Sequence, residues 1–400
     1  MQSNYILVLN CGSSSVKFAI IEPNTEENIL NGLVQCIGIT NTSIRWRYKN
    51  EPRQEQNLKK GNYQDAFETI VSLINDSYKL NHLICAIGHR VVHGGEHFTQ
   101  AAIVNTKSLK AISACCNLAP LHNPANIAGI EAAISIFPKL PQVVVFDTAF
   151  HQTMPQCAYL YPIPYHLYEK NAVRRYGFHG ISHQYVTQQA AKMLGLKLED
   201  SAFICAHLGN GCSATAILNG ASMDTSMGLT PLEGLMMGTR SGDVDPSLHA
   251  YLADNLGYDV HKVTNILNKE SGLLGISGKY SDMREIETAI EVGDERALLA
   301  AEMFCYRLAK YIAALSVPLG RIDALLFTGG IGENSDYIRA KTINLLKVLG
   351  FALDKGRNAV HGKNSSGIIT QEKSPTKAMV VATNEELLIA QETKRIVDKV

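Results

Sequence analysis

Two stretches of the chain share one plan: an apolar strand, a turn of small residues and a second apolar strand. One is ILVLNCGSSSVKFAII, which begins at Ile6, and the other is FICAHLGNGCSATAIL, which begins at Phe203. They start about 200 residues apart, half of this chain of 400 residues, and no shorter repeat period is present. We therefore predict two halves of related construction, each opening with a hairpin whose tip is built from small residues. A chance similarity between two glycine-rich hairpins is the alternative.

Short apolar runs elsewhere predict buried strands, and runs with a period near 3.6 predict helices. The expected strands are 5–10, 17–22, 83–92, 142–150, 201–209, 213–220, 322–330 and 378–383, and the expected helices are 65–76, 182–195, 245–257, 296–315, 335–350 and 385–400. Strands mixed with helices predict an α/β protein. The polar, aperiodic span 41–61 reads as a surface excursion with room for one more hairpin.

Two helix starts are predicted from capping chemistry. Asp245 followed by Pro246 places a capping residue before a proline at the first helical position. Thr383 with Glu386 fits a capping box. In that arrangement Glu386 bonds back to the start of the helix and is structural.

Charge and cysteine content exclude several classes of protein. Lysine plus arginine number 37 and aspartate plus glutamate number 37, so no global field attracts nucleic acid or an acidic membrane. The chain has 9 scattered cysteines and no CxxC pair, which predicts reduced thiols in a cytoplasmic protein rather than disulfides or a zinc site. The sequence has no long apolar stretch, so we expect neither a signal peptide nor a transmembrane span.

The small-residue turns suit phosphate, because glycine lets backbone amides approach a ligand and serine hydroxyls and Lys17 add donors. A third loop, FTGGIGENS, lies between an apolar strand and a helix that starts near Asp336. No Walker loop is present, and the third glycine of a dinucleotide fingerprint is replaced by Ser335. A tight hairpin with solvated serines is the structural alternative for any one turn.

Polar residues gather at the ends of the predicted strands. Asp147 ends a buried strand, where a carboxylate is costly unless it meets water, a cation or a proton donor, and magnesium is suitable. Arg90 and Arg240 lie in glycine-flanked turns and could bind carboxylate or phosphate, although a surface salt bridge is the simpler role for a single arginine. His179 and His183 stand four residues apart as zinc ligands would, but Gly180 weakens a helix there and no HExxH motif is present.

These motifs together resemble the acetate kinase family, within the wider group that includes actin, hexokinase and the heat-shock ATPases. The resemblance runs from residue 5 to residue 392 in the order of the family, without a departure at the motif positions. It is carried by LNCGSSSVKF, GHRVVHGGE, LAPLHNPAN, FDTAFHQTMP, RRYGFHGISH, HLGNGCS, DTSMGLTPLEGLMMGTRSGDVDP, FTGGIGENS and TNEELLIA.

The resemblance implies two actin-like (ribonuclease H-like) domains of duplicated topology around a nucleotide cleft. The expected N-terminal domain is 1–150 plus 384–400, and the expected C-terminal domain is 151–383. The implied activity is the reversible transfer of the ATP γ-phosphoryl group to acetate, giving acetyl phosphate and ADP, by a homodimer that uses magnesium, with manganese as a possible substitute.

The resemblance also implies roles for individual residues. Those expected in catalysis are Arg90, Asp147, His179 and Arg240; magnesium would be held by Asn10, Asp147 and Glu385. Acetate would be bound by Arg90, Val92, Leu121, Phe178 and Pro231. The nucleotide would be bound by Asn10, Ser13, Ser15, Lys17, His207, Leu208, Gly209, Asn210, Gly211, Asp282, Met283, Arg284, Gly330, Ile331, Gly332, Glu333 and Asn334.

Two rival activities remain open at this point. A propionate kinase has the same chemistry, but the branched Val92 is expected to shorten the acid pocket and to favour acetate. A nucleotide-switched binding protein of the actin or chaperone type needs the phosphate hairpins but neither the two arginines nor the apolar pocket.

We expect direct in-line transfer without a phosphorylated enzyme, because acetate is already an anion and needs no general base.

Overall fold

The computed structural model describes residues 4–39, 41–120 and 122–399. The chain forms two compact units, Met1–Phe150 with Asn384–Val400 and His151–Thr383. In the described residues no helix combines the length and the apolar character needed to cross a bilayer.

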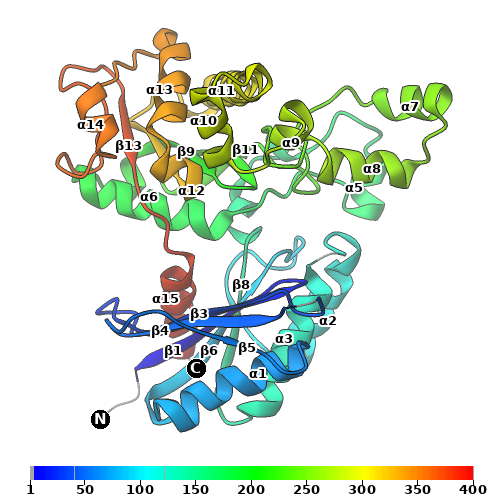
Figure 1. Cartoon of the computed structure of the whole chain (residues 1–400), viewed down its shortest axis with the longest axis vertical. Helices are drawn as coiled ribbons and strands as arrows, with labels where there is room; N and C mark the ends of the chain where they lie inside the picture. The colour runs from blue at the N-terminus through cyan, green and yellow to red at the C-terminus, as the bar shows by residue number, and fades with distance from the viewer. Residues whose placement is uncertain (1–3, 40, 121, 400) are drawn as a thin grey trace. The chain divides into compact units, whose positions relative to one another are not determined.

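The first unit is built on one eight-stranded sheet with the strand order β5-β4-β3-β2-β1-β6-β8-β7 (Figure 1). Its strands are β1 (Tyr5–Cys11), β2 (Ser15–Ile21), β3 (Asn28–Gln35), β4 (Ser43–Tyr48), β5 (Gln54–Asn57), β6 (Ile84–Val91), β7 (Ala102–Ile103) and β8 (Gln142–Phe146). Its α-helices are α1 (Tyr63–Ser72), α2 (Thr106–Ala114), α3 (Asn123–Ile136) and α15 (Glu385–Val397).

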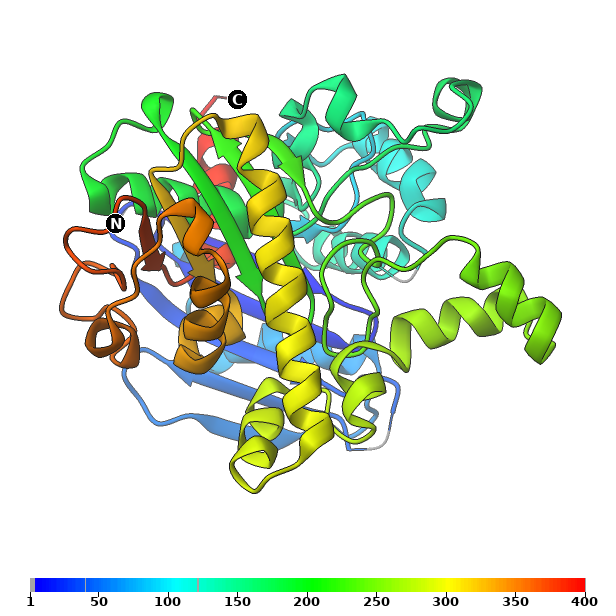
Figure 2. The same cartoon turned by 90° about the horizontal axis from the view of Figure 1, so that it is seen from above.

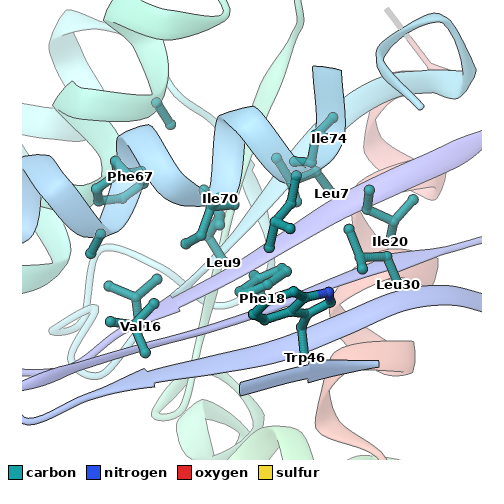
Figure 3. Packing of buried hydrophobic residues seen from close by; sticks show 14 of the residues in the cluster. Leu7, Leu9, Val16, Phe18, Ile20, Leu30, Trp46, Phe67, Ile70 and Ile74 are labelled. Carbon is teal, nitrogen blue, oxygen red and sulfur yellow. The ribbon is translucent and has the colours of Figure 1, made fainter. Parts of the chain in front are cut away.

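Helices cover both faces of this sheet, because successive side chains of a strand point to opposite faces. Leu9 and Phe18 face Phe67 and Ile70 of α1, as Figure 3 shows. Val8 lies level with Gly88 in the parallel pair β1–β6, and this opposite face is covered by α15. A Cβ atom on Gly88 would lie 2.3 Å from Thr393 Oγ1, so α15 approaches the sheet at a distance that only glycine allows.

The second unit is built on a five-stranded sheet with the order β11-β10-β9-β12-β13. Its strands are β9 (Ala202–Leu208), β10 (Cys212–Leu218), β11 (Ala221–Thr225), β12 (Ala324–Thr328) and β13 (Lys377–Val380). Its α-helices are α4 (Gln156–Tyr159), α5 (His166–Asn171), α6 (Gly180–Leu194), α7 (Leu248–Leu256), α8 (Val260–Lys269), α9 (Gly272–Ser277), α10 (Met283–Glu291), α11 (Glu295–Leu315), α12 (Gly329–Asn334), α13 (Asp336–Leu345) and α14 (Lys355–Ala359). The long α11 crosses one face of this sheet and α6 covers the other (Figure 2).

The two sheets repeat one topology. In the first unit β3, β2 and β1 run antiparallel, and β6 and β8 then continue parallel to β1. In the second unit β11, β10 and β9 run antiparallel, and β12 and β13 continue parallel to β9. The duplication predicted from the two hairpins is therefore confirmed at the level of whole sheets.

Some local predictions were wrong. The N-cap of α15 is Asn384, whose side chain accepts a hydrogen bond from the Leu387 N–H at 3.0 Å, and Glu386 contacts Lys17 instead of closing a capping box. Helix α7 begins at Leu248, because Asp245 caps a preceding turn at the Ser247 N–H. The span 41–61 does hold the predicted hairpin, β4 with β5, but it is not wholly at the surface.

The β4 strand contributes Ile44 and Trp46 to the core of the first unit. The chain segment 41–61 therefore extends the sheet as well as covering its edge.

Candidate active site

The turn between β1 and β2 leaves its three serines exposed or half-buried. The Gly12 N–H donates to the Ser15 carbonyl at 2.8 Å, which closes the turn. Ser13 is exposed at its tip. Asn10 and Lys17 are opposite each other in the β1–β2 register. The four residues predicted to face phosphates thus lie on one short hairpin.

Arg90 lies close to two carboxylates of the first unit. Asp147 directly follows strand β8, and Glu385 is the first residue of helix α15. Its Nε and Nη2 donate to Asp147 Oδ1 and Oδ2 at 2.9 and 2.6 Å, and its Nε lies 4.0 Å from Glu385 Oε2. Asp147 is almost completely buried at the end of β8, and Glu385 opens α15. A carboxylate buried this deeply requires such a fork of donors.

This cluster perturbs the acidity of its members. Burial alone would lower the pKa of the Arg90 guanidinium, but the charges of Asp147 and Glu385 overcome it and raise that pKa. The pKa of Glu385 is raised, first by burial and then by the charges of Asp147 and Glu386, against the lowering effect of Arg90. A cation close to these carboxylates would relieve that excess of negative charge.

Two asparagines of α3, which the sequence analysis did not select, position the end of β6. Asn126 accepts from the Val92 N–H at 3.1 Å and donates to the Cys11 carbonyl at 2.6 Å. Asn123 accepts from the His93 N–H at 3.1 Å and donates to the His93 carbonyl at 2.9 Å. The signal was present in NPAN, since a polar pair spaced by three residues at a helix start lies on one face. Leu121 of the predicted acid pocket lies outside the described residues.

The donors available for a metal are hard oxygens. Asp147, Glu385 and the amide of Asn10 are the types that magnesium takes, and magnesium keeps several waters and needs few carboxylates. Within residues 4–39, 41–120 and 122–399 no group of three or more His, Cys, Asp or Glu is arranged to hold a metal. The hard oxygens of Asp147, Glu385 and Asn10 fit magnesium that binds together with a phosphate ligand.

His179 and His183, the alternative zinc pair, share a serine hydroxyl. His179 Nδ1 and His183 Nε2 lie 2.9 and 2.8 Å from the Ser213 Oγ. His179 has a left-handed backbone (φ 56°) directly before α6 and is partly exposed, whereas His183 is fully buried one turn later.

Arg240 and His179 converge on the second small-residue turn. A Cβ atom on Gly211 would lie 3.4 Å from Arg240 Nη2 and 3.6 Å from His179 Nε2. Arg240 Nη1 donates to the Pro231 carbonyl at 2.8 Å, which brings Pro231 to the same place. Burial lowers the pKa of Arg240, and no carboxylate in the described part of the chain forms an ion pair with it. A guanidinium and an imidazole beside a glycine turn are groups that can bind an anion.

Three other residues selected from the sequence, Phe178, His207 and Leu208, lie next to His179 or next to this turn. Phe178 is buried next to His179, and its carbonyl lies 2.9 Å from His151 Nε2. The ring of His207 lies 4.3 Å from that of His179, centroid to centroid, and its Nδ1 is 2.8 Å from Ser182 Oγ. Leu208 is a fully buried strand residue at the start of the turn.

A cavity of about 650 Å³ lies beside the same turn, within the second unit. Its lining residues are Gly209, Asn210, Ser281, Asp282, Met283, Arg284, Glu287, Gly330, Ile331, Asn334 and Ser335. Eight of the residues predicted to bind nucleotide are thus brought to one hollow, since only Ser281, Glu287 and Ser335 of this lining were not selected from the sequence. Glu287 stands one helical turn after Met283 on α10, and that spacing is the signal that could have found it.

Gly332 and Glu333 do not line this cavity. Glu333 Oε1 accepts hydrogen bonds from the Gly329 N–H and the Thr383 N–H, both at 3.1 Å. Its carboxylate therefore joins the start of α12 to the segment that follows β13. Gly329 has φ 75°, and a Cβ there would lie 2.8 Å from the Leu208 carbonyl oxygen. The predicted FTGGIGENS loop is therefore largely a short helix, α12, fixed against β9.

Comparisons with known proteins agree across the whole chain. The model of the acetokinase family matches residues 5–391. A protein named acetate kinase from Shewanella baltica (strain OS155 / ATCC BAA-1091) is 52% identical over 400 residues, covering 100% of both chains.

Solved structures give the same result. A propionate kinase from Francisella tularensis subsp. tularensis SCHU S4 is 51% identical with a TM-score of 0.93, covering 98% of this chain and 100% of that one. The acetate kinase of Porphyromonas gingivalis is 42% identical with a TM-score of 0.92, at the same coverage. On its sequence and on its fold, the chain belongs to the acetokinase family.

Proposed function

We propose that this protein is an acetate kinase, which transfers the γ-phosphoryl group of ATP to acetate and runs reversibly. The observation that carries the proposal is the convergence of Arg240 and His179 on Gly211, beside a cavity able to take the rest of a nucleotide. Family membership supports a phosphotransferase with a carboxyl acceptor.

The chemistry we propose is positioning and charge compensation. Acetate is already a carboxylate, so its oxygen can attack phosphorus without a general base. Two unit charges about 4 Å apart repel by roughly 4 kcal/mol at an effective dielectric of 20. Arg90, Arg240 and His179 are proposed to offset this repulsion and to stabilise charge on the equatorial phosphoryl oxygens. We propose transfer in one step, without a phosphorylated enzyme.

Each small-residue turn is proposed to bind phosphate within its own unit. Asn10, Ser13, Ser15 and Lys17 would donate to phosphate oxygens, and the adenosine end would enter the cavity lined by α10 and α12. Asn10, Asp147 and Glu385 would hold magnesium, which supplies positive charge to the phosphates.

Formation of acetyl phosphate tests the proposal. The protein is incubated with MgATP and acetate, and acetyl phosphate is trapped with hydroxylamine as the coloured hydroxamate. We expect hydroxamate only when acid, ATP and divalent cation are all present. ATP hydrolysis that is independent of acetate, without hydroxamate, would instead support a nucleotide-switched binding protein.

Propionate is the second candidate acid, because the Francisella relative is named a propionate kinase. We propose that Val92 and Phe178 contact the methyl group of acetate and that the branched Val92 disfavours one more methylene. Such discrimination is worth about 1–3 kcal/mol, or roughly 10- to 200-fold. The ratio of kcat/KM for acetate and propionate decides between the two: a ratio above about 10 supports acetate, and a ratio below one supports propionate.

Assembly and location are proposed from the family and from the thiols. We propose a homodimer, which light scattering on the purified protein tests: a mass of one chain would contradict it.

All nine cysteines are free, and burial raises the pKa of the Cys11 thiol to about 12, so it is unreactive. Free thiols of this kind support a reducing compartment such as the cytoplasm.

A further inference from the structure

Two histidines and one serine form a hydrogen-bonded chain behind the anion site of the second unit. His179 Nδ1 lies 2.9 Å from Ser213 Oγ, and the same oxygen lies 2.8 Å from His183 Nε2. Ser213 and His183 have no exposed surface, and Ser213 is the second residue of β10, directly after the Gly209–Gly211 turn. These two hydrogen bonds therefore connect the partly exposed His179 to the interior of the unit.

A serine hydroxyl has one proton, so it can donate to only one of the two rings. No third partner of the Ser213 hydroxyl exists among the described residues. One histidine must therefore donate to Ser213 while the other accepts from it. Which one donates decides the tautomer of His179.

His183 determines the direction. Burial first, and then the charges of His151 and His207, hold its pKa well below the usual 6.5, so the ring is neutral and has one N–H. Its Nδ1 is buried and has no hydrogen-bond partner in the part of the chain that the structure describes. A proton on Nδ1 would be an orphaned buried donor, which is rare in proteins, whereas a proton on Nε2 reaches Ser213. His183 Nε2 therefore donates to Ser213, and the Ser213 hydroxyl donates to His179 Nδ1.

The proton of a neutral His179 is then on Nε2, the nitrogen that lies beside Gly211 and the Arg240 guanidinium. In the other tautomer a lone pair would occupy that position and would repel a phosphoryl oxygen. A doubly protonated ring would also have to donate to Ser213 from Nδ1, which would leave the serine proton without an acceptor.

We propose that Ser213 and His183 are positioning residues that hold His179 in its Nε2–H tautomer, so that it donates a hydrogen bond to the transferring phosphoryl group. This inference rests on the proposed function only for the identity of the acceptor. The direction of the hydrogen-bonded chain rests on the positions of the three side chains and on the burial of His183.

Nitrogen NMR of the ring tests the direction without reference to activity. In protein with ¹⁵N-labelled histidine, the His179 resonances are assigned by their loss in His179→Gln, and long-range ¹H–¹⁵N spectra report which nitrogen has the proton. We expect Nε2–H in the wild type and a shift toward Nδ1–H in Ser213→Ala. A wild-type ring protonated on Nδ1, or a tautomer unchanged in Ser213→Ala, would overturn the inference.

Kinetics test the consequence, with a matched control. We expect Ser213→Ala to lower kcat about tenfold, since one hydrogen bond is worth about a factor of ten, while KM for ATP changes little. The control is Ser222→Ala, because Ser222 is equally buried and bonds His151 Nδ1 at 2.9 Å in the same histidine cluster, but does not contact His179. Equal losses in both variants would show a structural effect and contradict the positioning role.

Replacement of His183 provides the rescue. In His183→Gln the amide N–H₂ can take the position of Nε2 and donate to Ser213, whereas His183→Leu cannot. We expect His183→Gln to retain most of kcat and the Nε2–H tautomer, and His183→Leu to lose both. If the wild type makes no acetyl phosphate yet shows the predicted tautomer, the proposed function fails and the hydrogen-bonded chain stands.

Discussion

Arg90 and Arg240 are chemically alike but have different surroundings. Arg90 is held by Asp147 and approached by Glu385, whereas Arg240 donates to the Pro231 carbonyl, its one hydrogen-bond partner among the described residues, and leaves Nη2 beside Gly211. Removal of Arg90 therefore disturbs the fold and the site, and removal of Arg240 disturbs mainly the site.

The Arg240→Ala variant tests the anion site. We expect kcat to fall about 10²-fold or more, because a charged contact to the phosphoryl group is lost, while the urea midpoint changes little. Arg240→Lys should recover only part of kcat, because lysine lacks the planar fork. Arg321→Ala, which removes a half-exposed arginine paired with Asp200, is the control and should retain full activity. Near-normal turnover of Arg240→Ala would remove this residue from the reaction.

Arg90→Ala has a second effect, because it leaves Asp147 as a buried, uncompensated carboxylate. We expect a loss of about 3–5 kcal/mol in the free energy of unfolding, measured with urea. In the double variant Arg90→Ala with Asp147→Asn, most of this stability should return while kcat stays low. An Arg90→Ala protein as stable as the wild type would contradict the role assigned to the pair.

At the scale of elements, patterns that repeat were predictable and single contacts were not. The hairpin β1–β2 and its counterpart β9–β10 were expected from apolar runs and small turns, and the sheets around them share one order. The cap of α15 was predicted wrongly because Thr383 and Asn384 are both good caps. Thr383 is instead engaged in tertiary contacts, since its hydroxyl bonds the Ser182 hydroxyl and its N–H donates to Glu333.

The candidate site shows the same limit. Gly209 and Asn210 lie in the HLGNGCS motif, and the family resemblance implied a nucleotide role for Asp282, whereas Glu287 was not expected and is found only among the residues that line the cavity. Glu333 lies in a motif, yet its carboxylate faces backbone N–H groups. A motif predicts which loop matters, and the direction of each side chain depends on packing that the motif does not contain.

The corrected cap of α15 gives a prediction at this scale. We expect Asn384→Ala to cost about 1 kcal/mol in the free energy of unfolding, because the Leu387 N–H loses its acceptor. Asn384→Ser keeps a capping oxygen and should cost much less. An equal effect of the two variants, in urea denaturation at neutral pH, would argue against Asn384 as the cap.

At the scale of the whole molecule, buried neutral histidines make the fold sensitive to acid. Burial lowers the pKa of His89 to about 4 and that of His93 to about 4, and the pKa of His183 is also well below 6.5. Below pH 6.5 the unfolded chain binds protons that the folded chain does not. Stability is therefore full above pH 6.5 and falls as the pH drops toward 4, by up to about 1.4 kcal/mol per pH unit for each such histidine.

Urea midpoints between pH 7.5 and pH 4.5 measure this loss. His89→Gln should reduce the slope, because it removes one buried titrating ring, and His261→Gln should leave the slope unchanged, because His261 is exposed on α8. A wild-type midpoint that is constant over this range would contradict the prediction.

A single-turnover experiment tests the proposed direct transfer of the phosphoryl group from ATP to a carboxylate. Protein in excess is mixed with magnesium and ATP labelled in its γ-phosphoryl group, with and without acetate, and the label is followed after rapid denaturation. We expect label to move to acetyl phosphate only when acetate is present, and none to remain on the protein. Label attached to the denatured chain, or no transfer that depends on acetate, would contradict it.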